Sequence, residues 1–361
     1  MSNDNSQPVS PSPPEDQDLQ GDVISNEDVT ELLDTETGRQ LPPVEAPSSA
    51  FLLQLFLIPM IIVSIVVMVW LMFSWLAHLG SDPRDLVRDL GSLNKSSWQK
   101  AWTLSNLLRN ADNDALKDDQ DLADELIRVL EKELEGGSLD PSRIRLRIFL
   151  CHCLGEFRLQ TSLPTLLKAA TLDRDLSELD VRLAALESLA KMAQNVGPEK
   201  VRESDVLVDT LLTISQLRED NPELQHRNEI RSTAAYTLGV IGGKRSLDRL
   251  AQMTGDSYTN SRFNAATGLA RYGDPRAAEV LLQMLDPVDE FVVAGEKTPE
   301  AQGNKRSSVI RNGIRATEFY SQNGGTEKME SLLTALQRLE SSMLPMAIRL
   351  QAKETLLKIR E

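Results

Sequence analysis

The sequence has few of the residues that usually build catalytic centres and disulfide frameworks. Its 361 residues include two cysteines and three histidines, and aromatic residues make up 4% of the chain. Cys151 and Cys153 are only two positions apart, so they cannot join distant segments, which argues against a disulfide-rich extracellular module. Basic residues are interspersed with acidic ones instead of forming a stripe, which predicts no nucleic-acid partner. Phosphate loops, nucleophile elbows and dinucleotide-binding turns are also missing from the sequence.

Cys151, His152 and Cys153 form the one cluster with metal-ligand chemistry. Consecutive side chains on a helix diverge by about 100°, so three adjacent residues do not converge on one tetrahedral ion. The sequence therefore predicts that this cluster packs in a core. It predicts no metal site and no cofactor.

Charged residues are absent from one long stretch, Phe51 to Leu79. The hydrocarbon core of a bilayer is about 30 Å thick and needs about 20 apolar residues in a helix. The stretch follows an acidic segment and lacks the basic start of a signal peptide, so we expect an uncleaved anchor. We predict a single transmembrane helix over residues 51–79, either bent at Pro59 or starting near it, and a juxtamembrane linker or helix over 80–94, with a helix start at Asp82-Pro83. A buried helix of a soluble protein is the alternative.

Residues 1–50 carry much of the net charge of −15, because they contain eleven acidic residues and only one basic residue, Arg39. The segment is also rich in proline and has no aromatic residue. Such a composition buries too little apolar surface to offset chain entropy. We therefore predict a disordered, acidic tail.

One part of this tail, residues 24–34, has the pattern of a short amphipathic helix. Acidic residues fill its first turn, and its apolar positions are candidates for binding a partner: Ile24, Val29, Leu32 and Leu33. The sequence ISNEDVTELLD in this segment resembles the N-terminal peptide LSQxEIDALL of flagellar motor switch proteins, which docks on a response regulator. That resemblance implies recruitment of a response-regulator-like partner. Solvated disorder is the alternative for this segment.

After residue 80 the sequence is helical in pattern and repeats itself. No stretch there alternates apolar and polar residues long enough to predict a sheet. Several segments instead approach the pattern apolar-Arg-x-x-Ala-x-x-x-Leu-small-x-apolar; they begin at Val181, Ile230, Ser261 and Ile348, with weaker copies at Leu146 and Ile310. Positions 1, 5, 9 and 12 of the pattern fall on one helix face. One such helical hairpin cannot bury its face alone, so we expect the units to stack into a shared core.

These repeats resemble the bacterial form of the HEAT repeat, VRxxAAxALGxIGDPRAxxxLLxxL, which residues 270–285 follow closely. The resemblance covers residues 95–361. It implies an all-α, HEAT-like α-solenoid of about six units with a period of about 40 residues. Taken with the anchor and the tail, the chain resembles bacterial membrane-anchored HEAT-repeat proteins whose repeats are of the phycobilin-lyase type.

The arginine at the second repeat position is expected to pair with acidic residues of neighbouring turns. Its spacing is uneven, at 49, 31 and 87 residues between Arg182, Arg231, Arg262 and Arg349. The excess predicts longer helices near 200–229 and an irregular insertion at 286–308. Long loops in compact folds are either functional or disordered. Phe291 and Val292 in this insertion are candidate partner-binding residues, although part of it is expected to pack on the solenoid.

A solenoid offers an extended surface rather than a reactive pocket, so we expect a non-catalytic, membrane-tethered scaffold or adaptor for an unknown protein partner. Recruitment through residues 24–34 is one alternative. A HEAT-repeat enzyme is another: the lyases share the repeat pattern, but nothing in the sequence marks a bilin site. Metal-dependent HEAT hydroxylases use His-Glu pairs, and no His-Glu dipeptide occurs here.

Basic residues near the membrane ends predict the orientation. Arg39 stands alone before the apolar stretch, whereas Arg84, Arg88 and Lys95 follow it. Flanks rich in lysine and arginine stay in the cytoplasm. We therefore expect a cytoplasmic solenoid and an acidic tail on the other side of the membrane.

Overall fold

The computed structural model describes residues 48–78, 83–90, 96–216 and 225–360. The chain divides into two compact units, Met1–Met72 and Phe73–Glu361. Among the described residues every regular element is helical and none is a strand. This confirms the prediction of an all-α fold. The predicted disordered tail, up to residue 47, lies outside the described residues.

The long apolar stretch forms one helix, α1 (Ser49–His78), which continues through Pro59. Thirty residues at 1.5 Å each give a length of about 45 Å. Within α1, the 22 residues Leu53–Ser74 are long and apolar enough to cross a membrane, and none of this segment is buried in the structure. The predicted helix is therefore present, with the dimensions that a bilayer requires.

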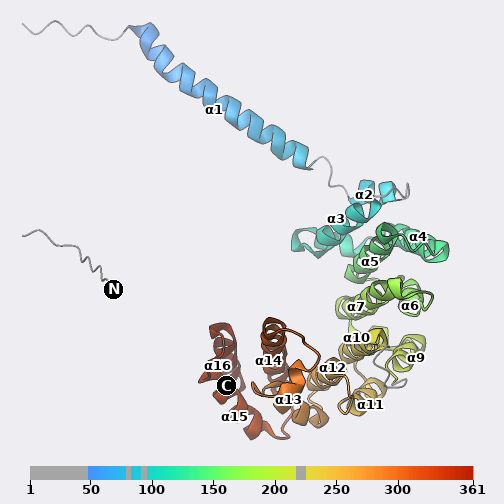
Figure 1. The fold of residues 1–361 in the computed structure, drawn as a ribbon. Coiled ribbons are helices and arrows are strands. Elements are labelled where there is room, and N and C mark those ends of the chain that lie inside the picture. Colours follow the sequence, from blue (N-terminus) through green and yellow to red (C-terminus); the bar gives the residue numbers. More distant parts are fainter. Residues whose placement is uncertain (1–47, 79–82, 91–95, 217–224, 361) are drawn as a thin grey trace, which may run out of the picture. The chain divides into compact units, whose positions relative to one another are not determined.

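The second unit arranges its helices in two rows (Figure 1). On the inner side of the curve lie α3 (Ser97–Arg109), α5 (Pro141–Glu156), α7 (Leu179–Val196), α10 (Gln225–Ile241), α12 (Thr259–Ala270), α14 (Pro299–Gln322) and α16 (Met346–Arg360). The outer row comprises α2 (Pro83–Leu90), α4 (Gln120–Gly136), α6 (Leu163–Ala170), α9 (Asp205–Ile214), α11 (Lys244–Met253), α13 (Ala278–Met284) and α15 (Met329–Glu340). Five short elements complete the described helices: η1 (Ala111–Asp118), η2 (Leu176–Glu178), α8 (Pro198–Arg202), η4 (Pro275–Ala277) and η5 (Glu290–Val293).

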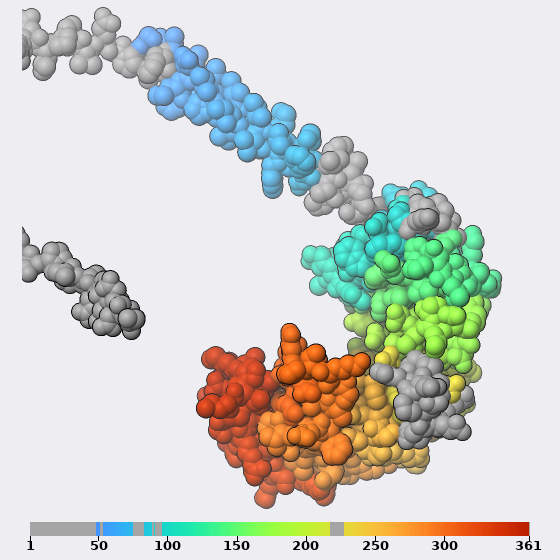
Figure 2. Space-filling model, viewed as in Figure 1, coloured from blue at the N-terminus to red at the C-terminus, as the bar shows by residue number. Residues whose placement is uncertain are grey.

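Each inner helix packs against the next inner helix and against an outer helix. Figure 2 shows the sequence colours following one another in order along the second unit, as this pattern of contacts requires. From α4 to α16 the described chain contains six pairs of an outer and an inner helix, as many units as the periodicity predicts. Such an arrangement is that of a solenoid, in which each unit contacts its neighbours.

Local sequence signals set the ends of the helices. Asp119 precedes α4, and its side chain accepts a hydrogen bond from the Leu122 amide, which satisfies a donor that the helix leaves unpaired. At the other end, α4 stops at Gly137, which has a φ of 60°. Asp140 and Pro141 then begin α5 in the same way, with a side-chain cap followed by proline in the first turn.

The repeat register predicts which leucines form the core. Leu189, Leu238 and Leu269 occupy the ninth position of successive repeats and are fully buried, and Leu356 is 4% exposed. The small residue at position 10 lets helix backbones approach. A Cβ atom added to Gly239 in α10 would lie 2.6 Å from the Cα atom of Gly268 in α12, which is closer than real Cβ contacts.

Two expectations based on repeat spacing are wrong. Residues 286–308 are not irregular throughout, because η5 forms within them and α14, a helix of 24 residues, already begins at Pro299. The extra residues near 200–229 do not lengthen the helices there. They form the short α8 and the ten-residue α9, while residues 217–224 lie outside the described residues.

Replacing Leu238 with alanine tests the register. Removing a fully buried leucine side chain costs the transfer free energy of its atoms and leaves a cavity, so we expect the free energy of unfolding to fall by about 2–5 kcal/mol. Val206→Ala, at a side chain that is 68% exposed, is the control and should change it by less than about 0.5 kcal/mol. Chemical denaturation measures both. An unchanged stability for Leu238→Ala would show that the register is incorrect.

Candidate functional site

Two of the repeat arginines form buried ion pairs with acidic residues that precede the next inner helix. Arg147 in α5 is fully buried and pairs with Glu178, immediately before α7. Arg231 in α10 makes two hydrogen bonds of 2.8 Å to the carboxylate of Asp256, which lies before α12. These two pairs link successive units, as the sequence predicts. Arg262 instead donates to the main-chain oxygen of Asp256 at 2.9 Å, and Arg349 is exposed.

Glu178 shows how strongly such a pair is held. Burial alone would raise the pKa of its carboxyl group, but hydrogen bonds and charges from Arg174 and Arg147 outweigh burial and lower the pKa. Arg174 contributes contacts of 2.6 and 2.9 Å to the two carboxylate oxygens. The carboxylate therefore stays ionised, and its contribution to stability is present near neutral pH and is lost as the pH falls through its lowered pKa.

Cys151 and Cys153 lie in the core of the solenoid, with no exposed surface. Burial raises the pKa of the Cys151 thiol to about 12, against a smaller opposing effect of Arg147, and burial also raises the pKa of Cys153. Burial lowers the pKa of His152 to about 4, with a further contribution from Arg109. The thiols are thus protonated core residues, as core packing predicts. In the described part of the chain, no three or more His, Cys, Asp or Glu side chains are grouped to hold a metal ion.

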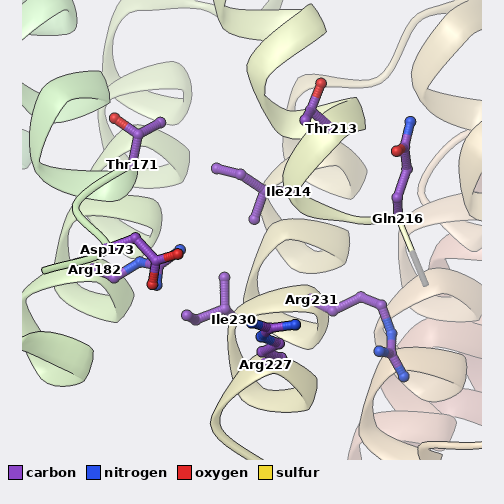
Figure 3. A pocket seen from close by; sticks show the side chains of 9 residues that line it. All are labelled: Thr171, Asp173, Arg182, Thr213, Ile214, Gln216, Arg227, Ile230 and Arg231. Carbon is purple, nitrogen blue, oxygen red and sulfur yellow. The ribbon is translucent and has the colours of Figure 1, made fainter. Parts of the chain in front are cut away.

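A cavity of about 200 Å³ lies among the ends of α6, α7, α9 and α10 (Figure 3). Its lining residues are Thr171, Asp173, Arg182, Thr213, Ile214, Gln216, Arg227, Ile230 and Arg231. Figure 3 shows Asp173 beside Arg182, and their ion pair measures 3.1 Å. Arg231 is already bound to Asp256. Two of the arginines in this cavity therefore hold the solenoid together.

The accessible face of the inner row is formed by positions 4 and 7 of the repeat. One helical turn separates these positions, so both lie on one side of the helix. They are Phe149 and His152 in α5, Glu187 in α7, Thr233 and Tyr236 in α10, and Asn264 and Thr267 in α12, whereas Ala184, at position 4 in α7, is buried. The face thus changes from aromatic in α5 to polar and mostly uncharged in α10 and α12.

Two adjoining cavities lie along this face. The first, of about 380 Å³, is lined by Glu187, Thr233, Tyr236 and Asn264. The second, of about 240 Å³, is lined by Ser232, Asn260, Phe263, Asn264, Thr267, Met284, Lys305, Ser308, Val309 and Asn312. Asn264 lines both of them, and we call the surface that these two cavities occupy along α7, α10, α12 and α14 the inner groove.

The structure separates the two candidate residues of the 286–308 segment. The side chain of Phe291 is 72% exposed, whereas Val292 is 2% exposed and belongs to the core. Val293 is also buried, so part of the segment packs on the solenoid as expected. A partner contact at this segment stays a prediction. The four tail candidates, Ile24, Val29, Leu32 and Leu33, lie outside the described residues.

Sequence reasoning missed the residues of the inner groove because it treated positions 4 and 7 as variable. The signal was present, since Thr233, Tyr236, Asn264 and Thr267 give these positions the same uncharged polar character in two successive repeats. Lys305 and Asn312 could not be placed in this way, because the long spacing before α14 obscured where the next repeat begins.

Comparison with known families identifies the repeat. Residues 210–296 match the family model described as HEAT repeats. The matched segment begins within α9 and contains α10 to α13, and the same two-row packing continues on both sides of it. A search of curated proteins finds no match. The match supports a HEAT-repeat protein, and HEAT repeats commonly mediate protein–protein interaction.

Replacing Arg147 with alanine should destabilise the solenoid strongly, because the buried carboxylate of Glu178 would lose one of its partners. Breaking a buried pair by removing one member costs about 3–5 kcal/mol. We expect the midpoint of urea denaturation to fall accordingly. Arg128→Ala, at an exposed position of α4, is the control. Equal midpoints for the two variants would contradict a stabilising role for the buried pair.

Proposed function

We propose that this protein is a membrane-tethered scaffold or adaptor that binds a partner protein through the inner face of its solenoid and performs no catalysis. The inner groove carries this proposal, because four successive inner helices contribute side chains to its two cavities. Solenoids bind through such extended surfaces. The HEAT repeats of residues 210–296 supply the central part of this face.

The membrane tether is supported by α1. Its Leu53–Ser74 segment exposes large apolar side chains along its length, among them Phe56, Met68 and Trp70. Contiguous apolar surface of this extent is unfavourable in water and matches the hydrocarbon core of a bilayer. The solenoid lies on the cytoplasmic side in this proposal, because Arg84, Arg88 and Lys95 follow the helix.

The absence of catalysis is proposed from the chemistry of the groups that the solenoid exposes. Cys151 and Cys153 are buried and protonated, whereas a nucleophilic cysteine needs an accessible thiolate. The inner groove is lined mainly by hydroxyl and amide side chains, which bind through hydrogen bonds and do not titrate near neutral pH. These properties favour recognition over chemistry.

Photo-crosslinking in native membranes tests the binding face. A photoreactive p-benzoylphenylalanine in place of Tyr236, which lines the inner groove, should give a discrete adduct with a partner protein. The same residue in place of Val206, an exposed position on α9 of the outer row, is the control and should give none. Adducts at Val206 alone, or equal adducts at both positions, would argue against the inner face.

Reporter fusions test the orientation. Green fluorescent protein fused after Glu361 should fluoresce, and alkaline phosphatase fused at the same point should be inactive, because the solenoid is expected in the cytoplasm. Fusions of the same reporters before Met1 should give the reverse pattern. Active phosphatase after Glu361 would place the solenoid outside and leave the tail segment 24–34 in the cytoplasm.

A further inference from the structure

The residues that line the inner groove come from four helices of the inner row. Helices α7, α10, α12 and α14 are consecutive in the inner row, and each packs on the next (Figure 1). Between α10 and α12 the backbones are close at Gly239 and Gly268, which keeps these two helices near each other beneath the groove. A ligand lying along the groove therefore meets one helix after another.

Uncharged hydrogen-bonding side chains dominate the lining of the groove. Thr233, Tyr236, Asn264, Thr267 and Asn312 present hydroxyl and amide groups that donate and accept hydrogen bonds. A matching ligand must carry both donors and acceptors at regular intervals. The main chain of an extended polypeptide does so, because each residue other than proline has one N–H and one C=O group.

Asn264 is oriented by the solenoid. Its Nδ2 atom donates to the carbonyl oxygen and the hydroxyl of Ser232, both at 3.0 Å. These bonds hold the amide group and leave its Oδ1 atom as an acceptor, and Asn264 lines both cavities. A side chain fixed in this way binds a ligand N–H with little further loss of conformational entropy.

The two ends of the groove carry opposite charges. Glu187 lies at the α7 end, and partial desolvation raises the pKa of its carboxyl group. Arg109 opposes this shift through its charge, but Arg109 is itself paired with Glu156 at 3.2 Å. Lys305 lies at the α14 end, where its ammonium group donates to Asn260, a neutral acceptor. A cation would complement the first end, and an anion the second.

The spacing of the helices sets the length of the ligand. Axes of packed helices are about 8–10 Å apart, and an extended chain rises about 3.3 Å per residue, so successive helices face about every third residue. The three intervals from α7 to α14 therefore correspond to about nine residues of extended chain. A segment of this length is a linear peptide, because about nine residues are too few to form a folded domain.

We infer that the inner groove binds an extended segment of about nine residues from the partner protein, through the main chain of that segment. A lysine or arginine of the segment lies at Glu187, and an aspartate or glutamate lies at Lys305. The inference rests on the proposed function, because it states the chemical class of the partner of that same face.

Peptide selection tests the groove directly. The full-length protein in lipid nanodiscs is exposed to a display library of random 12-residue peptides. Selected peptides should carry a basic and an acidic residue about six to nine positions apart. The Glu187→Lys variant should instead enrich an acidic residue at the position of the basic one. Glu203→Lys, at an exposed position after α8, is the matched control and should leave the selection unchanged.

Binding of one selected peptide, measured by fluorescence polarisation, tests the main-chain contacts. N-methylation of the peptide at the residues facing α10 and α12 should weaken binding at least tenfold, because it removes main-chain donors. Asn264→Ala in the protein should weaken binding to a similar extent, whereas Asn106→Ala in α3 should not. Melting curves of each variant, followed by circular dichroism, verify that the solenoid remains folded.

Three results would overturn this inference: no enrichment of peptides, enrichment that Glu187→Lys does not alter, or binding that N-methylation does not weaken. A different result would contradict the proposed function: no adduct forms when p-benzoylphenylalanine replaces Tyr236 in native membranes. If that crosslink forms with full yield in a Glu187→Lys, Asn264→Ala double variant, the inner face binds a partner and the extended-segment inference is wrong.

Discussion

The structure of the second unit depends on the burial of each inner helix against its neighbours in the row. A single pair of helices leaves its apolar face in water, so its stability must come from the adjoining pairs. The fully buried leucines at position 9 and the glycines that bring α10 and α12 together serve this one requirement. Because the apolar faces are buried between stacked units, the side chains on the accessible inner face are free to vary. That freedom is what gives α5, α10 and α12 different surfaces on a common framework.

Electrostatic contacts follow the same plan as the apolar ones. Arg147 and Arg231 each reach the acidic residue before the next inner helix, so the ion pairs run between consecutive units. Buried pairs add little net stability over well-packed apolar groups, yet they penalise any register in which a charge stays unpaired. In a chain of helices that share one repeat pattern, such pairs help to select the correct neighbour. Arg147 and Arg231 are therefore part of the framework, and we assign recognition to other positions.

The framework was predictable from the sequence because stacking imposes a strict period. Leu189, Leu238 and Leu269 were placed in the core from their equivalent positions alone, and burial confirms them. The inner groove was not predictable, because Asn264 and Glu187 occupy positions on which packing places no demand. Their significance appears only when the row brings them together across three units. The expectations for residues 200–229 and 286–308 were wrong for a related reason. Uneven spacing between repeats breaks the period that would locate the ends of α9 and α14.

Contacts confined to neighbouring units make the second unit behave as an elastic body. A small rotation at each interface adds along the row, so the curvature can change substantially while every individual interface keeps its packing. In the inferred binding mode, a ligand stretched from α7 to α14 lies along the inner side of that curve, where bending changes the distance between helices. Flattening the curve separates Glu187 from Lys305, and tightening it brings them closer. In this binding mode, the fit of a linear ligand is therefore a measure of the curvature of the solenoid.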